Sequence, residues 1–237
     1  MSNADFVLIT GAARRIGRSM ALAVATAGDN VALHYNTSEK EALSLKATIE
    51  GLGRKVILVR GDLSKVEEVE AIIPSVLEQG RLRALINNAS IFEPFTLHSA
   101  DASNWNHNLM VNLTAPYLLS RAFALEVKQG VIINILDWRA LRTDAEHLPY
   151  AVSKGALHSL TLNLASALAP SIRVNGIALG AILPPEGRGI SADPLMRVPL
   201  KRWGTLEEVN ESLLFLLNGP SYITGEVLHL DGGRHLV

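Results

Sequence analysis

Short apolar runs alternate with longer segments of helical spacing along almost the whole chain. The runs occupy 6–10, 31–35, 55–60, 83–89, 131–137, 172–179 and 226–232. Continuous apolar runs of this kind are typical of strands that are buried on both faces of a parallel sheet. The helical segments between them span 15–27, 39–51, 66–79, 102–128, 150–169 and 205–217. A strand–helix repeat of roughly 25–30 residues predicts a doubly wound α/β sheet.

The composition fits one globular domain over residues 1–237 and argues against several classes of partner. Hydrophobic residues make up 48% and charged residues 19%, with a net charge of −1, so no basic surface for nucleic acid is indicated. Cysteine is absent and the histidines lack metal-ligand spacing, so no metal site is expected. No apolar run reaches the length of a membrane span, and the first residues lack a signal-peptide pattern. We expect a soluble, cytoplasmic protein that binds neither membranes nor nucleic acid.

The segment TGAARRIG (10–17) lies where the first expected strand passes into the first expected helix. A glycine at such a turn lets the backbone approach a pyrophosphate, and the helix N-terminus supplies free N–H groups and a positive potential. Gly11 and Gly17 suit these roles, although Arg15 takes the place of the usual middle glycine. Together with the strand before it and the helix after it, this turn predicts a dinucleotide site.

The end of the second expected strand favours NADPH over NADH. An NAD site generally places an acid there to bind the ribose 2′-hydroxyl. The chain instead reads His34, Tyr35, Asn36, Thr37 and Ser38, with no acid before Glu39. Arg14 or Arg15 in the glycine turn would suit a 2′-phosphate. Positive charge at the start of a helix opposes the helix dipole, which favours a ligand role for these arginines.

Tyr150 and Lys154 are four residues apart, a spacing that places both side chains on one face of a helix. An ammonium beside a phenol lowers the pKa of the tyrosine and makes it a usable acid or base. Asp137, at the end of the fifth expected strand, would act in the opposite direction on that pKa. The three residues predict proton transfer with an unusual carboxylate member.

The segment LPPEGRGISADPLMRVP (183–199) interrupts the strand–helix pattern with four prolines and two glycines. Long loops inside a compact domain are usually functional, and this one follows the sixth strand at the edge where open α/β sheets bind ligands. We interpret it as a substrate loop; the alternative is a tolerated surface insertion.

These motifs, with Gly61-Asp62-Leu63, Asn87-Asn88-Ala89, Asn112, the IRVN strand and Asp231-Gly232-Gly233, occur in a fixed order. In this the chain resembles the short-chain dehydrogenase/reductases over essentially its full length. The resemblance implies an NAD(P)-dependent oxidoreductase with a seven-stranded parallel sheet, usually a homotetramer. It implies that Tyr150 exchanges a proton with substrate, that Lys154 binds the nicotinamide ribose and lowers the tyrosine pKa, and that Asn112 holds a proton-relay water. It also implies that Asp62 contacts the adenine.

The sequence motifs and the resemblance together predict which residues bind the cofactor. They are Gly11, Arg14, Arg15, Ile16, Gly17, His34, Tyr35, Asn36, Thr37, Ser38, Asp62, Leu63, Asn88, Ala89, Ser90, Tyr150, Lys154, Gly180 and Ile182.

Within the family, the chain is most similar to the pteridine and dihydromonapterin reductases. Asp137 stands where most members carry serine, and Arg15, the His34-Tyr35 pair, the run 87–90 followed by Phe92, and the ending DGGRHL (231–236) are also similar. This resemblance implies that Phe92 sandwiches a pterin ring against the nicotinamide, with Arg15 and Ser90 in contact with it. Two departures are Thr37, where some pteridine reductases carry a basic residue, and Leu179-Gly180, where Pro-Gly is common.

The chemistry of Asp137 separates the candidate reactions. Reduction of a carbonyl develops an oxyanion that an ionised carboxylate would repel, whereas reduction of a cyclic C=N bond places the proton on nitrogen. We therefore expect NADPH-dependent reduction of a dihydropteridine, with Asp137 assisting protonation. The alternatives are a carbonyl reductase acting on a 3-oxoacyl thioester, sugar or other alcohol, and a nucleotide-sensing protein without turnover.

Overall fold

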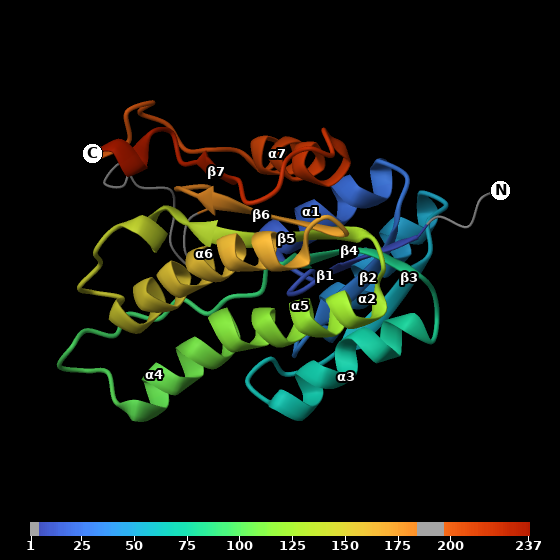
Figure 1. Cartoon of the computed structure of the whole chain (residues 1–237), viewed down its shortest axis with the longest axis horizontal. Coiled ribbons are helices and arrows are strands. Elements are labelled where there is room, and N and C mark those ends of the chain that lie inside the picture. The colour runs from blue at the N-terminus through green and yellow to red at the C-terminus, as the bar shows by residue number, and fades with distance from the viewer. Residues whose placement is uncertain (1–4, 184–196) are drawn as a thin grey trace.

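The computed structural model describes residues 5–183 and 197–237, which form one seven-stranded sheet flanked by helices (Figure 1). The strands are β1 (Phe6–Ile9), β2 (Asn30–Tyr35), β3 (Val56–Arg60), β4 (Leu82–Asn87), β5 (Gly130–Asp137), β6 (Ile172–Leu179) and β7 (Val227–Leu230). They pair in parallel in the order β3-β2-β1-β4-β5-β6-β7. The predicted doubly wound sheet is confirmed.

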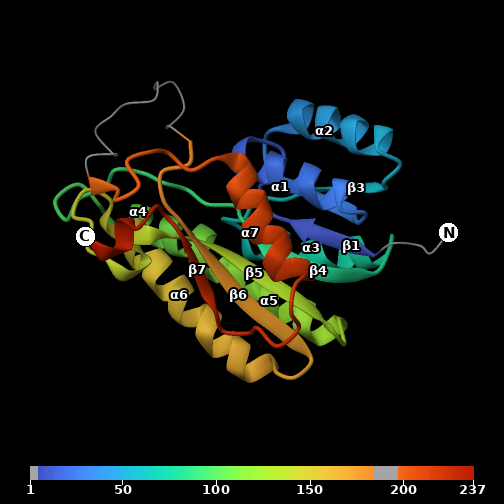
Figure 2. The ribbon, with the colours of Figure 1, turned by 90° about the horizontal axis from the view of Figure 1, so that it is seen from above.

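The helices follow the strands in the predicted alternation. They are α1 (Arg15–Thr26), α2 (Glu39–Gly51), α3 (Val66–Leu77), α4 (Ala102–Leu109), α5 (Ala115–Glu126), α6 (Leu148–Leu168) and α7 (Leu206–Asn218). Helices α1, α2 and α7 pack on one face of the sheet, and α3, α5 and α6 on the other (Figures 1 and 2). Strand β1 is buried at all four positions, which explains its uninterrupted apolar sequence.

The strand order reverses between β1 and β4, and this determines where a ligand fits. Chain connections leave the two strands toward opposite sides there, which opens a crevice at their carboxyl ends. The glycine turn after β1 and the loop after β4 both border this crevice.

The prediction of one continuous helix over 102–128 is wrong. A π-helical turn, η1 (Met110–Thr114), separates α4 from α5 and contains Asn112. Pro116 has no N–H to donate to the Asn112 carbonyl four residues earlier, and its ring would clash with that carbonyl in a regular α-helix. The widened turn relieves that clash, and such turns are frequent at functional sites.

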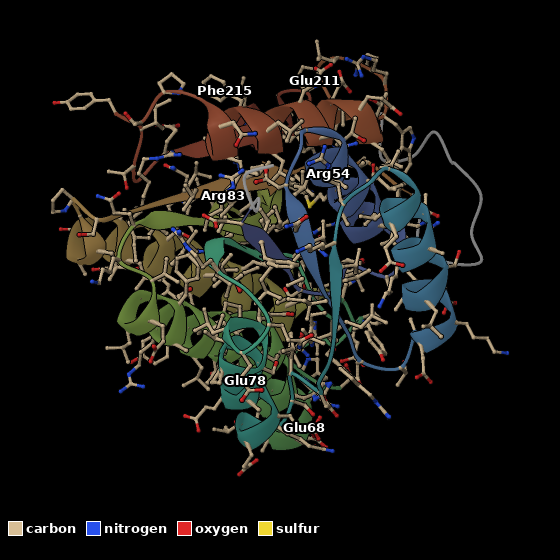
Figure 3. All side chains as sticks on the ribbon, turned by 90° about the vertical axis from the view of Figure 1, so that its right-hand side faces the viewer. Arg54, Glu68, Glu78, Arg83, Glu211 and Phe215 are labelled. Carbon is tan, nitrogen blue, oxygen red and sulfur yellow. The ribbon has the colours of Figure 1, made fainter. Side chains whose placement is uncertain are left out.

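The amino end of the sheet is closed by polar contacts that have no role at the crevice. Arg83, labelled in Figure 3, lies at the start of β4. It donates to Asp29 over 2.6 Å and to Asn218 at the end of α7 over 2.8 Å. These contacts join β4 to α7 and leave the carboxyl end as the open side of the sheet.

Within 5–183 and 197–237, no helix combines the length and apolar character needed to cross a membrane. The predicted substrate loop 183–199 falls mostly outside the described residues, so only Leu183 and 197–199 of it enter the site below.

Candidate active site

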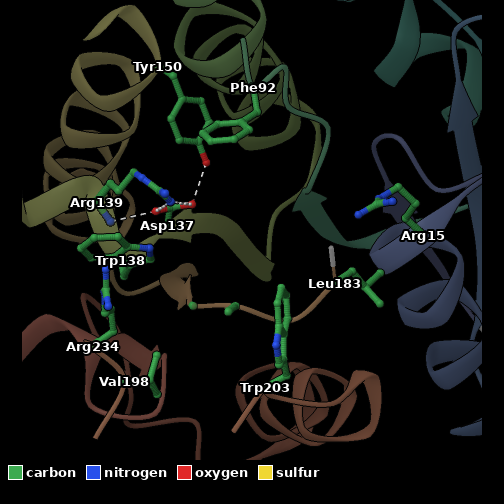
Figure 4. Close-up of a pocket in the computed structure, with 12 residues that line it drawn as sticks. Arg15, Phe92, Asp137, Trp138, Arg139, Tyr150, Leu183, Val198, Trp203 and Arg234 are labelled. Carbon is green, nitrogen blue, oxygen red and sulfur yellow. Dashed lines mark hydrogen bonds and ion pairs between the residues drawn. The ribbon is translucent and has the colours of Figure 1, made fainter. Parts of the chain in front are cut away.

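A pocket of about 420 Å³ opens at the carboxyl ends of β5 and β6 (Figure 4). Its lining includes four residues predicted from the sequence to act on substrate: Arg15, Phe92, Asp137 and Tyr150. Strand β5 delivers Asp137 at its last position, and the first turn of α6 delivers Tyr150. Residues from distant parts of the sequence therefore meet in one cavity.

The Tyr150 hydroxyl donates a hydrogen bond to Asp137 Oδ2 over 2.9 Å. Burial raises the pKa of Tyr150 well above its ordinary value, and the charge of Asp137 raises it further. Burial and Asp137 decide the direction here, and the expectation that Lys154 lowers this pKa stays a prediction. Lys154 Nζ donates to the Ile135 carbonyl over 2.8 Å and lies 5.9 Å from the centroid of the tyrosine ring, because it is directed beneath the ring. Burial lowers the pKa of Lys154 itself to about 8.

Arg139 is a site residue that the sequence analysis missed. Its backbone N–H and its Nη1 donate to Asp137 Oδ1 over 2.8 and 3.2 Å, and its Nε donates to Asp144 over 2.6 Å. Burial alone would lower the pKa of Arg139, but the two carboxylates outweigh burial and raise it. Arg139 therefore holds Asp137 mainly through Oδ1, with a longer contact of 3.5 Å from Nη1 to the Oδ2 that accepts from Tyr150. The sequence offered one indication of this role, which is that Arg139 follows Asp137 by two residues. It was missed because the residues between the strand and the next helix have neither strand nor helix periodicity.

Phe92 lies against the same group of side chains. The His147 ring stacks on it at a centroid distance of 4.1 Å and an interplanar angle of 11°, and the Tyr150 ring meets it edge-on at 4.7 Å. Phe92 is still 45% exposed, so ring surface is available toward the pocket. The Arg139 guanidinium carbon lies 5.3 Å from the same ring centroid, and the stacking of a flat ligand that the resemblance implies stays a prediction.

Arg15 reaches the pocket from the opposite wall to Asp137 (Figure 4). Its backbone has φ of 52°, a left-handed conformation that ordinarily requires glycine. This explains why related turns carry glycine at this place. Holding an arginine in that conformation costs of order 1 kcal/mol, and such strain clusters at ligand sites.

The glycine turn forms a close-packed cradle. Gly11 has φ of 62°, and a Cβ on Gly17 would lie 2.2 Å from the Gly11 carbonyl oxygen and 2.7 Å from Asn88 Nδ2. Asn88 Nδ2 donates to the Thr10 carbonyl over 2.8 Å, and Ala89 N donates to Thr10 Oγ1 over 3.0 Å. A side chain at position 17 is thus excluded, and the backbone at the start of α1, which includes Ile16, suits the approach of a pyrophosphate.

His34 is placed beneath this cradle. It is buried, its Nδ1 accepts from Gly11 N over 3.1 Å, and its Nε2 donates to the Gly61 carbonyl over 3.0 Å. Burial lowers the pKa of His34 to about 4, partly offset by the bond to Gly61. Both ring nitrogens are used within the protein, so His34 positions the turn rather than contacting a nucleotide. Tyr35 is also buried, whereas Asn36 and Thr37 are exposed and Ser38 is half-buried.

A shallow basic hollow of about 450 Å³ lies beside the start of α1. Its lining includes four cations, Arg14, Arg15, Arg18 and Lys40, and one acid, Glu41. Its position, next to the glycine turn and the end of β2, suits the 2′-phosphate of NADPH. Arg18 and Lys40 were not predicted, although Arg18 follows Arg14 by one helical turn.

The Asn112 side chain holds the loop after β4. Its Oδ1 accepts from Ser90 Oγ over 3.0 Å and from Ile91 N over 2.9 Å, and its Nδ2 donates to Ser153 Oγ over 3.1 Å. The side chain is fully engaged, so any relay water would be held by the backbone of the π-helical turn. Ser90 faces Asn112 and does not line the pocket, and its predicted ligand contacts stay a prediction.

The remaining predicted cofactor residues border the crevice. Asp62 Oδ1 accepts from Ser64 N over 2.9 Å and Ser64 Oγ over 2.7 Å, and these bonds lower the pKa of Asp62. Leu63 and Ile182 are buried and position the loops that carry them. Gly180 lines the pocket, and a Cβ there would lie 2.6 Å from Asp231 Cα, so the turn after β6 requires a glycine whether or not proline precedes it.

In the parts of the chain that the structure describes, no three His, Asp or Glu side chains are grouped closely enough to hold a metal ion.

The sheet order, the glycine cradle and the Tyr-Lys pair define a class of dinucleotide-dependent oxidoreductases. Residues 11–235 match the family model described as enoyl-(acyl carrier protein) reductase. A 3-oxoacyl-[acyl-carrier-protein] reductase from Synechocystis sp. is 32% identical over 97% of this chain and 96% of that protein. The chain belongs to the short-chain dehydrogenase/reductase family, as predicted.

Solved structures extend the comparison. FolM alternative dihydrofolate reductase 1 from Brucella canis, complexed with NADP, superposes with a TM-score of 0.90 at 34% identity over 100% of this chain and 96% of that one. A blue fluorescent protein from a metagenomic library, in complex with NADPH, superposes with a TM-score of 0.92 at 26% identity, over 98% of both chains. The relatives thus include both an alternative dihydrofolate reductase and a 3-oxoacyl-[acyl-carrier-protein] reductase.

Proposed function

We propose that this protein reduces a dihydropteridine to its tetrahydro form with NADPH. The hydrogen bond from Tyr150 to Asp137 Oδ2, inside a pocket that Phe92 and Arg15 also line, is the observation that carries the proposal. A dihydropteridine is flat, so it suits the exposed ring surface of Phe92. Its amino-pyrimidine edge presents N–H donors that a carboxylate can accept. The FolM neighbour from Brucella canis supports this assignment over a ketone.

The cofactor site fits NADPH. The side-chain-free cradle at Gly11 and Gly17 suits the pyrophosphate, and the hollow with Arg14, Arg18 and Lys40 suits the 2′-phosphate. Two neighbours solved with NADP or NADPH support this choice. NADPH supplies the hydride when bound.

The residues of the chain itself manage the proton. The Tyr150 hydroxyl proton lies between its own oxygen and Asp137 Oδ2, and burial keeps the phenol protonated by raising its pKa. Arg139 holds Asp137 chiefly through Oδ1, and Oδ2 accepts the tyrosine hydroxyl. Protonation of a ring nitrogen then draws on the Tyr150–Asp137 pair, with Asp137 assisting the transfer, and a proton from solvent restores the pair afterwards.

A second candidate is reduction of a 3-oxoacyl thioester. The Synechocystis relative and the matching family description favour it, and Tyr150 and Lys154 suit it equally well. Asp137 speaks against it because a carboxylate next to the hydroxyl repels a developing oxyanion.

A substrate panel separates the candidates. Purified protein is given NADPH with dihydromonapterin, dihydrobiopterin, dihydrofolate and acetoacetyl thioester, and NADPH oxidation is followed by absorbance. We expect turnover with the pterins and little with the thioester, and loss of both in Tyr150→Phe. Turnover of the thioester alone would overturn the proposal, and cofactor binding without turnover of any substrate would indicate a nucleotide-sensing protein.

The homotetramer implied by the resemblance stays a prediction. Exposed apolar side chains on α5 (Tyr117, Leu125) and on α6 (Val152, Leu162) offer surfaces for such an assembly. Sedimentation equilibrium of the purified chain measures the state directly. The expected cytoplasmic location is likewise untested.

A further inference from the structure

Two side chains behind the pocket, Asp144 and His147, connect its proton-transfer pair to its aromatic wall. Neither is among the residues that line the pocket, and none of the proposed reduction steps uses them. Asp144 belongs to the connection between β5 and α6, where it is half-buried while the other residues of 141–146 are exposed. A carboxylate that is turned inward from an exposed segment needs partners that replace its lost hydration.

The partners of Asp144 come from both sides of it in the chain. Its Oδ2 accepts from Arg139 Nε over 2.6 Å. Its Oδ1 accepts the backbone N–H groups of Glu146 and His147 over 3.0 and 3.1 Å, where the chain enters α6. The ring Nδ1 of His147 lies 3.2 Å from Oδ2. Burial alone would raise the pKa of Asp144, but these partners together lower it, so the group is a carboxylate at neutral pH.

The bond to Arg139 connects Asp144 to the proton-transfer pair. Arg139 donates to Asp137 Oδ1 from its backbone N–H and from Nη1, and the Tyr150 hydroxyl donates to Asp137 Oδ2 over 2.9 Å (Figure 4). A guanidinium that is bonded to carboxylates on both sides has little freedom to turn away from either. Asp144 therefore limits the positions that Asp137 can take.

The contact with His147 connects Asp144 to the aromatic wall. The His147 ring stacks on Phe92 at a centroid distance of 4.1 Å, and its Nδ1 faces Asp144, which orients the ring in its own plane. Phe92 in turn meets the Tyr150 ring edge-on at 4.7 Å, so the two connections meet again at the tyrosine. The contacts form a closed series of six side chains: Asp144, Arg139, Asp137, Tyr150, Phe92 and His147.

We propose that Asp144 is a positioning residue that acts on two parts of the site together. It holds Asp137 toward the tyrosine hydroxyl through Arg139, and it holds the Phe92 ring in place for the flat part of the substrate through His147. This inference rests on the proposed function for the identity of the substrate. A displacement of about 1 Å at the reacting groups can lower a rate roughly 100-fold, so a residue that touches no substrate still affects turnover.

Asp144→Asn tests the proposal with little change of shape. An amide has one oxygen in place of two, so it cannot accept from Arg139 and from the backbone N–H groups of Glu146 and His147 at once. For dihydropterin we expect kcat to fall roughly tenfold, because Asp137 is less well held. We expect KM to rise roughly three- to tenfold, because Phe92 is less well held. Steady-state NADPH oxidation measures both constants.

Asp29→Asn is the matched control at the opposite end of the sheet. Asp29 accepts from Arg83 Nε over 2.6 Å, and its side chain is 14% exposed, against 15% for Asp144. This variant should lower the melting temperature about as much as Asp144→Asn and leave kcat and KM unchanged. Equal losses of kcat in the two variants would assign the effect to stability alone and overturn the inference.

Double-mutant cycles test the two connections separately. Arg139→Gln removes the connection to Asp137, and His147→Ala removes the connection to Phe92. Asp144→Asn should add little further loss of kcat to Arg139→Gln and little further rise of KM to His147→Ala, since the contact concerned is already absent. Additive effects in both cycles would overturn the inference.

Nuclear magnetic resonance of His147 separates this inference from the proposed function, because it needs no turnover. In protein with labelled histidine, the ring resonances of His147 are identified by their absence from His147→Ala, and stacking on Phe92 displaces them. In Asp144→Asn they should move toward the resonances of the exposed His98. Unchanged resonances would overturn the role of Asp144 even if pterins are reduced. Movement of the resonances in a protein that reduces no pterin would refute the pterin assignment and support the role of Asp144.

Discussion

The hydroxyl of Tyr150 donates to Asp137 Oδ2 at 2.9 Å, while Lys154 donates to the Ile135 carbonyl. The tyrosine hydroxyl is therefore bonded to an acid, while the lysine ammonium lies 5.9 Å from the centroid of the tyrosine ring. Burial together with the charge of Asp137 keeps the pKa of Tyr150 well above its ordinary value, so the phenol is present as a proton donor. This favours a substrate atom that accepts a proton beside a carboxylate, as a ring nitrogen does.

Asp137→Ser should reduce kcat for dihydropterin by roughly 100-fold or more, because general acid–base groups contribute about 10²- to 10⁴-fold. Steady-state NADPH oxidation measures the change. Serine can still accept the Arg139 backbone N–H that Asp137 accepts at 2.8 Å, so thermal unfolding and NADPH affinity should stay close to wild type. Retained pterin reduction in a folded variant would remove Asp137 from the mechanism.

Arg139→Gln should lower kcat for dihydropterin roughly tenfold. The variant loses the bonds from Arg139 to Asp137 at 3.2 Å and to Asp144 at 2.6 Å, so the carboxylate that faces Tyr150 is no longer held. Arg139→Lys keeps the charge and should recover part of the rate. A positioning role therefore predicts an ordered series in kcat, read beside KM and the melting temperature. Equal rates in the Lys and Gln variants would mean that the charge has no role.

Gly17→Ala should abolish most NADPH binding. The added Cβ would lie 2.2 Å from the Gly11 carbonyl oxygen, so the turn that receives the pyrophosphate must shift. Fluorescence titration with NADPH measures the loss. Gly51→Ala is the matched control, because a Cβ there meets nothing within 4 Å at the end of α2. Similar affinity in both variants would show that the cradle geometry is not needed.

The fold could be predicted almost completely from the sequence. Strands buried on both faces, such as β1 and β5, leave an unbroken apolar signal, and glycines report backbone conformations directly. The break between α4 and α5 was not predicted, because the helical spacing of apolar residues continues through Asn112. Only the missing N–H of Pro116, four residues later, indicates it.

The site was predictable where residue type and chain position coincide, as for Asp137 and Tyr150. The sequence could not place Arg234 beside the adjacent residues Trp138 and Arg139, because the end of β5 and the last residues of the chain meet only in the folded protein. It also suggested that Lys154 would act on the pKa of Tyr150. The actual direction of the lysine, beneath the ring and onto the Ile135 carbonyl, depends on packing around β5.

In His34→Gln the free energy of unfolding should depend less steeply on pH under acidic conditions than in the wild type. Burial between Gly11 and Gly61 lowers the pKa of the wild-type His34 to about 4, from its ordinary value of 6.5. Between these two pH values the unfolded chain binds a proton that the folded protein does not. The contribution of His34 to the free energy of unfolding is therefore fully present above about pH 6.5 and is lost as the pH falls toward about 4. Urea unfolding at several pH values measures the free energy of unfolding for both proteins.

How the difference in the free energy of unfolding between wild type and His34→Gln changes with pH shows whether His34 is responsible. Above pH 6.5 the wild type should be more stable, by about 1–3 kcal/mol, since glutamine cannot reproduce both buried bonds of the ring. As the pH falls the wild type alone must take up a proton at this site, which removes the acceptor of the Gly11 N–H, so the gap should narrow. Other groups titrate in both proteins and cancel in the difference. His98→Gln, which replaces an exposed histidine, should follow the wild-type curve. Parallel curves for wild type and His34→Gln would show that His34 does not couple the glycine turn to pH.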